Sequence, residues 1–166
     1  GLGRVGTVDE TTLGAFADHV ASVLPAGPSG LFVGGDESAT VQRVAVLGGA
    51  GDSALEAARA AGVDVYLTAD LRHHPASEFR ETARIAGSNI ALIDCSHAAS
   101  ESLWLRSAAP RLCALLAERG FTIETKLSAL NTDPWDFTVS TGVATGHDAH
   151  SASTEPAAAW TSLTEK

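Results

Sequence analysis

Short apolar runs alternate with helical patterns along most of this chain. The runs at 41–47, 63–67 and 89–93 are bounded by Gly, Asp or Ser, which is typical of buried strands. A polar turn and then a stretch with helical spacing of its apolar residues follow each run. This order predicts an α/β fold with a mostly parallel sheet and helices on both faces, in three layers.

Further elements are expected on either side of these units. The chain between the strands and after them carries apolar residues three or four positions apart, with glycine and proline as breaks. A short strand is also expected at 31–33. The predicted helices run from Thr7 or Asp9 to Leu24, over 53–61, from the turn at Pro75 to Gly87, and from His97 to Arg119 with a break near Ala108 before Pro110.

The C-terminal part of the chain has a different pattern. Apolar and polar residues alternate over 121–127, which predicts an outer strand. Residues 141–166 are rich in Ser, Thr, Ala and Gly and predict a flexible tail after a domain of residues 1–140. We expect His147 and His150 in this tail to be solvated and not to bind metal.

Composition narrows the classes of protein. The 166 residues are 45% apolar and 19% charged, which suits one globular domain. The net charge of −9 argues against a nucleic acid as partner. No apolar run reaches the length of a membrane span, and no signal peptide is visible. Only two cysteines are present, too few for a disulfide framework, so we expect reduced thiols and a cytoplasmic location.

Polar side chains cluster in the turns that follow the three central strands. Asp52 follows the first strand, Asp70 with His73 and His74 follows the second, and Asp94, His97 and Glu101 follow the third. Right-handed crossovers place such turns at one edge of a parallel sheet. We therefore expect an active or binding site at this edge.

His97 and Glu101 form the most specific pair in this group. Four residues separate them at the start of a predicted helix, so their side chains lie on one face. An imidazole and a carboxylate at this spacing can bind one divalent ion. The alternative is a capped helix with a solvated His–Glu pair, because the spacing alone is a weak pattern.

Two nearby features carry alternatives of their own. Gly48-Gly49-Ala50-Gly51 resembles a dinucleotide-binding turn, but the GxGxxG spacing is not met. A tight turn that allows close backbone packing is favoured slightly, and a contact with a substrate phosphate stays open. Cys95 is expected to be a small buried core residue, although a metal ligand or reactive thiol is the alternative.

Four motifs in order resemble one known family. VAVLGGAGDS, DVYLTADLRHH, LIDCSHAASE and NTDPWDF, with the opening GLGRVG, are similar to the GTP cyclohydrolase I type 2 homologues, the Nif-three-like family. The resemblance covers residues 1 to about 140. In the family's TGD–aromatic–His motif this chain has Thr68-Ala69-Asp70, with His73 at the aromatic and His74 at the histidine. Cys95 and Ser96 replace the small pair of the next motif.

The resemblance implies a dinuclear metal protein that assembles as a hexamer, with this chain as one lobe of the fold. His97 and Glu101 would be metal ligands, and Glu101 would bridge two divalent ions. If the protein is a hydrolase, we expect Asp70 and His74 as catalytic residues, with one or the other relaying protons or orienting a ligand. The ligand types suit zinc, iron, manganese and nickel alike. The family's N-terminal half, with a His-His pair and an Asp, has no counterpart here, so we expect a fragment that holds part of the site.

Three functions follow from these expectations. The first is a metal-dependent hydrolase acting on a nucleotide-like or other small phosphorylated substrate. The second is a non-catalytic metal-binding oligomeric scaffold or metal-handling protein. The third is a nucleotide-binding module that uses the glycine loop without metal.

Overall fold

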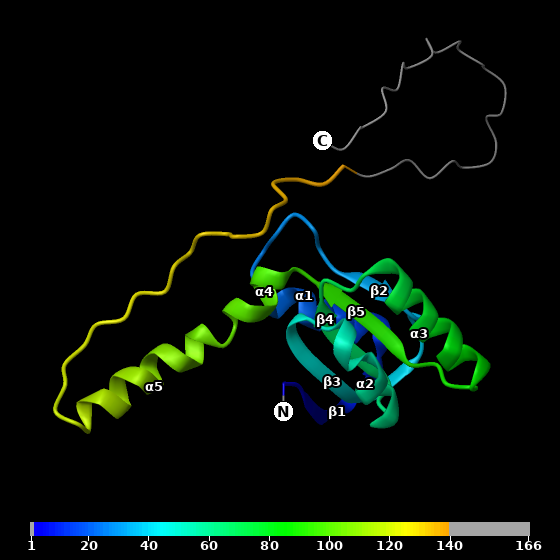
Figure 1. Ribbon diagram of the computed structural model, residues 1–166, viewed down its shortest axis with the longest axis horizontal. Helices are drawn as coiled ribbons and strands as arrows, with labels where there is room; N and C mark the ends of the chain where they lie inside the picture. Colours follow the sequence, from blue (N-terminus) through cyan, green and yellow to red (C-terminus); the bar gives the residue numbers. More distant parts are fainter. Residues whose placement is uncertain (1, 140–166) are drawn as a thin grey trace, which may run out of the picture.

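A five-stranded mixed sheet organises the chain (Figure 1). The computed structural model describes residues 2–139, and the predicted α/β class is confirmed. The strands lie side by side in the order β1-β3-β4-β5-β2. The elements are β1 (Arg4–Thr12), α1 (Leu13–Val23), β2 (Phe32–Gly34), β3 (Thr40–Ala50), a 3₁₀ turn η1 (Asp52–Ala54), α2 (Leu55–Ala60), β4 (Val65–Ala69), α3 (His73–Ile85), β5 (Ala91–Cys95), α4 (His97–Ser102) and α5 (Leu105–Ala117).

Parallel pairing is confined to the centre of the sheet. β4 pairs in parallel with β3 on one side and with β5 on the other, so Val65 lies between Val44 and Ala91. The outer strands β1 and β2 run antiparallel to β3 and β5. The three central strands are those with continuous apolar runs, as expected for strands covered on both faces. Their carboxyl ends therefore meet at one edge of the sheet.

Helices cover both faces of this sheet, as predicted. Successive residues of a strand point to opposite faces. Val65, with no exposed surface, packs in one apolar cluster with residues of α1 such as Leu13. Tyr66, 2% exposed, packs in the other cluster with residues of α2 and α3 such as Phe79. The two clusters hold the sheet in the middle of three layers.

The N-terminal helix is shorter than predicted. Residues 4–12 form β1 along β3, and the expected helix start at Thr7 or Asp9 is wrong. This stretch contains several β-branched residues, which favour a strand when a partner strand is available. Thr12 ends the strand and caps α1, since its Oγ1 accepts a hydrogen bond from the Ala15 N–H at 3.2 Å.

The elements after β5 also differ from the predicted ones. The predicted break near Ala108 is wrong, because Pro110 lies inside α5 and the interruption falls at Leu103 and Trp104. The Trp104 carbonyl accepts bonds from the N–H groups of Ser107 and Ala108 and so starts a new helix. The predicted strand over 121–127 is absent, since this segment is irregular and finds no partner strand. The predicted tail at 141–166, with His147 and His150, lies outside the described residues.

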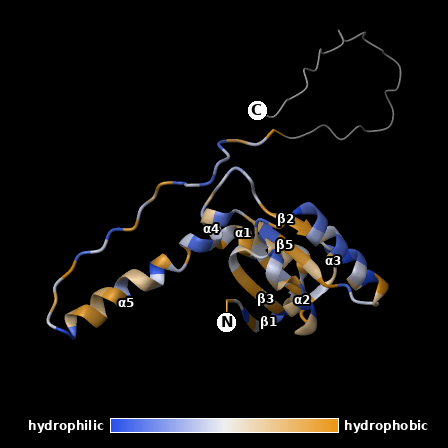
Figure 2. Cartoon of the chain, in the orientation of Figure 1, coloured by the Kyte–Doolittle hydropathy of each residue, from blue (hydrophilic) through white to orange (hydrophobic). Residues whose placement is uncertain are grey.

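Helix α5 extends away from the sheet (Figure 1). None of its residues is buried, and Figure 2 shows apolar residues along it. Leu112 and Leu115 are exposed, as are Trp104 before the helix and Phe121 after it. Within 2–139, no helix combines the length and apolar character that crossing a membrane requires.

Candidate metal centre

Three loops meet at the carboxyl edge of the central strands. The end of β3 contacts α4, because the Gly49 N–H donates to Ser100 Oγ at 2.9 Å. The loop after β4 is tied to the end of β5, because the Leu71 N–H donates to Asp94 Oδ1 at 3.1 Å. Arg72 joins this set through an ion pair with Asp52. The structure thus brings together the polar loops that the sequence placed at one edge.

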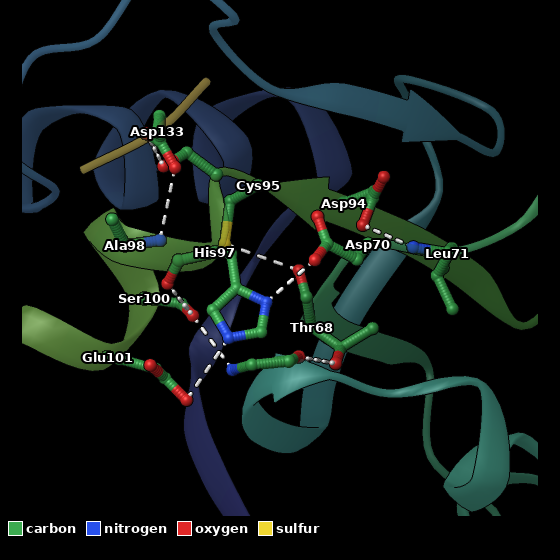
Figure 3. A network of polar contacts seen from close by, with 12 residues as sticks. Thr68, Asp70, Leu71, Asp94, Cys95, His97, Ala98, Ser100, Glu101 and Asp133 are labelled. Carbon is green, nitrogen blue, oxygen red and sulfur yellow. Dashed lines mark hydrogen bonds and ion pairs between the residues drawn. The ribbon is translucent and has the colours of Figure 1, made fainter. Parts of the chain in front are cut away.

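His97 is the centre of this group (Figure 3). Its Nδ1 lies 2.6 Å from Asp70 Oδ2, and its Nε2 lies 3.3 Å from Glu101 Oε1. The side chains of His97, Asp70 and Glu101 are 41%, 57% and 58% exposed, so a ligand can reach them. The hydrogen bond that the His97 ring donates to Asp70, helped by the charge of Glu101, raises the pKa of His97 above its ordinary 6.5. Asp70 holds one ring nitrogen and leaves the other facing Glu101.

Asp70 has an unusual backbone conformation. Its φ of 51° makes it the one non-glycine residue with positive φ among residues 2–139. A side chain in this left-handed region costs roughly 1–2 kcal/mol. Asp tolerates the region better than most residues, and such strain is concentrated at functional sites. Here it coincides with the carboxylate that contacts His97.

The glycine loop packs tightly against this group. Gly49 has a φ of 74°, and a Cβ there would lie 2.9 Å from Glu101 Oε1 and 3.5 Å from His97 Nε2. A Cβ on Gly51 would lie 1.9 Å from Thr68 Oγ1. The Gly51 N–H donates to the Ala69 carbonyl at 3.1 Å, and the Gly49 N–H is used by Ser100. Close packing thus explains these two glycines, and their N–H groups are already bonded within the protein.

Two groups beneath the surface have altered proton affinity. Burial raises the pKa of Asp94, and the hydrogen bond from Leu71 partly offsets this. Burial and the nearby Asp94 charge raise the pKa of Cys95 to about 11. Cys95 Sγ donates to the Thr68 carbonyl at 3.2 Å. A buried, protonated and hydrogen-bonded thiol is a core residue and a poor nucleophile or ligand.

His74, the second predicted catalytic residue, is placed apart from this group. It is exposed in the first turn of α3, where its ring meets that of His73 edge to face at 5.3 Å between centroids. Among the described residues no hydrogen bond or ion pair joins either ring to His97 or Asp70. The predicted pair His97 and Glu101 is adjacent, whereas His74 is not part of their contacts.

Residues 2–139 do not supply a full set of ligands for a metal ion. Within residues 2–139, no three His, Cys, Asp or Glu side chains are arranged to hold an ion. His97 and Glu101 offer two converging donor atoms, and Asp70 is bonded to the far nitrogen of the same ring. A histidine ligand commonly has a carboxylate in that position. The residues therefore fit part of a divalent-metal site.

Sequence reasoning missed Asp133. Its carboxylate hydrogen bonds with Ser96, and it accepts from the Ala98 N–H at 3.2 Å (Figure 3). Both partners lie at the start of α4, which carries His97. The motif around Asp133 was visible in the sequence, but no pattern indicated which helix it would contact.

Comparison with known proteins identifies relatives over most of the chain. Residues 1–134 match the family described as Duf34/NIF3 (NGG1p interacting factor 3). A protein named GTP cyclohydrolase 1 type 2 homolog from Mycobacterium leprae is 45% identical over 137 residues, which are 82% of this chain and 34% of that protein. The protein of the same name from Streptomyces coelicolor is 44% identical over 81% of this chain and 46% of its own length.

Solved structures agree with these matches. The crystal structure of a Bacillus cereus protein related to NIF3 has a TM-score of 0.69 and 31% identity, and covers 83% of this chain and 36% of that one. The Staphylococcus aureus protein SA1388 has the same TM-score at 29% identity. The chain thus spans between a third and a half of the length of these relatives.

Proposed function

Since the chain belongs to the Duf34/NIF3 family, we propose that it supplies part of a divalent-metal centre with His97 and Glu101 as ligands. The observation that carries this proposal is the 3.3 Å separation of His97 Nε2 and Glu101 Oε1 at an open sheet edge. Asp70 supports it, because its bond to Nδ1 sets the tautomer that leaves Nε2 free to bind. The remaining ligands then come from residues outside 2–139.

We propose that the whole protein is a metal-dependent hydrolase acting on a nucleotide-like or other small phosphorylated substrate. Two bound divalent ions would supply the charge that polarises the scissile bond. Glu101 would hold metal together with His97. Asp70 would orient His97 and would neutralise the charge that develops on the ring. His74, exposed at the start of α3, would contact substrate and not metal.

The names of the relatives support the family of this chain and do not identify its substrate. They are called GTP cyclohydrolase 1 type 2 homologs, and GTP is one substrate to test among several nucleoside phosphates. The glycine loop gives little support to a metal-free nucleotide site, because the N–H groups of Gly49 and Gly51 are bonded elsewhere.

A second candidate has its own observation. Exposed apolar residues on α5 and after it favour protein contacts, and a metal-binding oligomeric scaffold would use them. We propose a homo-oligomer, a hexamer in the full-length form, for either function. Light scattering with and without added zinc would measure the mass of the assembly.

Turnover that depends on metal separates the two candidates. We expect phosphate or ring-opened product from nucleoside phosphates with zinc or manganese in the full-length protein, and none with chelator. Glu101→Gln should abolish this turnover. Glu118→Gln, an exposed glutamate at the end of α5, is the matched control and should leave turnover unchanged. Metal-dependent assembly without turnover would favour the scaffold.

A further inference from the structure

The carboxylate of Asp133, in the NTDP motif, contacts the beginning of α4. Asp133 hydrogen bonds with the Ser96 hydroxyl and accepts the Ala98 N–H at 3.2 Å. Ser96 and Ala98 are the two chain neighbours of His97. Asp133 therefore contacts both chain neighbours of the residue that forms the centre of the site, through the side chain of Ser96 and the backbone of Ala98.

Contacts of the neighbouring residues fix the backbone around Asp133. Asn131 Oδ1 accepts the Asp133 N–H at 3.0 Å, which closes an Asx turn. Pro134 follows and restricts Asp133 to extended backbone conformations. Thr138 Oγ1 donates to the Pro28 carbonyl at 3.0 Å and anchors the same segment a few residues later. An otherwise irregular segment is thus fixed where it meets α4.

Helix α4 needs such contacts. It has six residues, only Ala99 among them is buried, and helices this short are marginal without tertiary contacts. Ser96 Oγ accepts the Ala99 N–H at 3.1 Å, and Asp133 accepts the Ala98 N–H. Together they satisfy two donors that a helix leaves without partners at its start. On its other side α4 is held by the bond between Ser100 and Gly49.

We propose that Asp133 is a positioning residue for the metal centre, acting on His97 and Glu101 by fixing the start of α4. The proposal rests on the proposed function only in taking His97 and Glu101, which α4 carries, as metal ligands. The positioning itself is a property of the metal-free chain. The segment around Asp133 is thereby a structural part of the site, although Asp133 itself is not a metal ligand in this proposal.

Four variants test the proposal. Asp133→Ala and Ser96→Ala each remove one side of the contact, and Ser96→Thr keeps the hydroxyl. Asp136→Ala removes the same charge from the same segment, at a residue without a hydrogen-bond or ion-pair partner in the described chain. Amide hydrogen exchange over 97–102 reports the helix, and the ring ¹⁵N shifts of His97 report its bond to Asp70. Both are measured without metal.

Asp133→Ala and Ser96→Ala should speed exchange over 97–102 by about fivefold, the usual effect of losing a cap. The His97 ring signals should move toward those of a free imidazole, and zinc should bind roughly tenfold more weakly. Ser96→Thr and Asp136→Ala should match the unsubstituted chain in all three.

Equal exchange and equal ring signals in Asp133→Ala and Asp136→Ala would overturn the positioning role. Faster exchange with unchanged ring signals would also overturn it, because Asp133 would then be a helix cap alone. Absence of zinc binding by the unsubstituted chain would count against the proposed function, and the two metal-free readouts would still decide the role of Asp133.

Discussion

Replacing Gly49 by alanine should weaken metal binding at little cost to the fold. A Cβ at Gly49 would lie 2.9 Å from Glu101 Oε1, closer than such atoms approach, so the carboxylate must move away from His97. Glu101 is 58% exposed and can move easily. The main cost to stability is the left-handed conformation at φ 74°, about 1 kcal/mol.

Gly62→Ala is the matched control. Gly62 also has positive φ, at 62°, but a Cβ there would meet nothing within 4 Å. Both variants should lose about 1 kcal/mol of unfolding free energy, a fall of roughly 4 °C in Tm. Only Gly49→Ala should bind zinc more weakly, by about tenfold or more. Displacing the ligand Glu101 should lower the zinc affinity at least as much as losing a residue that supports a ligand.

Calorimetric titration with zinc and thermal unfolding by circular dichroism measure the two effects separately. Equal zinc affinity in Gly49→Ala and Gly62→Ala would refute the argument, because the contact with Glu101 would then have no part in binding. A much larger loss of stability in Gly49→Ala would show that Glu101 cannot yield, contrary to its exposure.

Three further results are expected. Gly51→Ala should cost about 3 kcal/mol of unfolding free energy, because its Cβ would lie 1.9 Å from buried Thr68 Oγ1; urea unfolding measures this. Because the pKa of His97 is raised in the folded chain, protonated His97 stabilises the fold fully below pH 6.5, and this stabilisation is lost as the pH rises through the pKa of the folded state. NMR titration should show the raised pKa in the unsubstituted chain and not in Asp70→Asn. Cys95, with a pKa of about 11, should resist iodoacetamide at neutral pH until the chain unfolds.

The central sheet was predictable because its strands are covered on both faces. Burial on two sides requires a continuous apolar run, and such runs occur at β3, β4 and β5. The loops after these strands then lie at one edge because the three strands are parallel. The spacing of His97 and Glu101 predicted that they would be adjacent on one helix face.

The edges and the end of the chain could not be predicted in the same way. β1 is exposed along most of its length, so no apolar alternation marked it, and only its pairing with β3 makes it a strand. The run at 121–127 has alternation but no partner strand. Pairing is a tertiary property that local pattern does not contain.

Two site features depend on contacts between distant segments. The hydrogen bond between His97 and Asp70 joins residues 27 positions apart, and Asp133 contacts Ala98 across 35 positions. Asp70 was predicted as a catalytic residue, and the geometry adds an orienting contact with His97. The sequence showed which residue types were available, but the fold decides which of them meet.

Titration of zinc into the chain by calorimetry tests the central claim most directly. The unsubstituted chain should bind zinc weakly, because its residues 2–139 supply His97 and Glu101 but not a full set of ligands. His97→Ala and Glu101→Gln should show no binding while keeping a native circular dichroism spectrum. Unchanged zinc affinity in a natively folded Glu101→Gln variant would contradict the account and reduce His97 and Glu101 to a solvated pair on the surface of a helix.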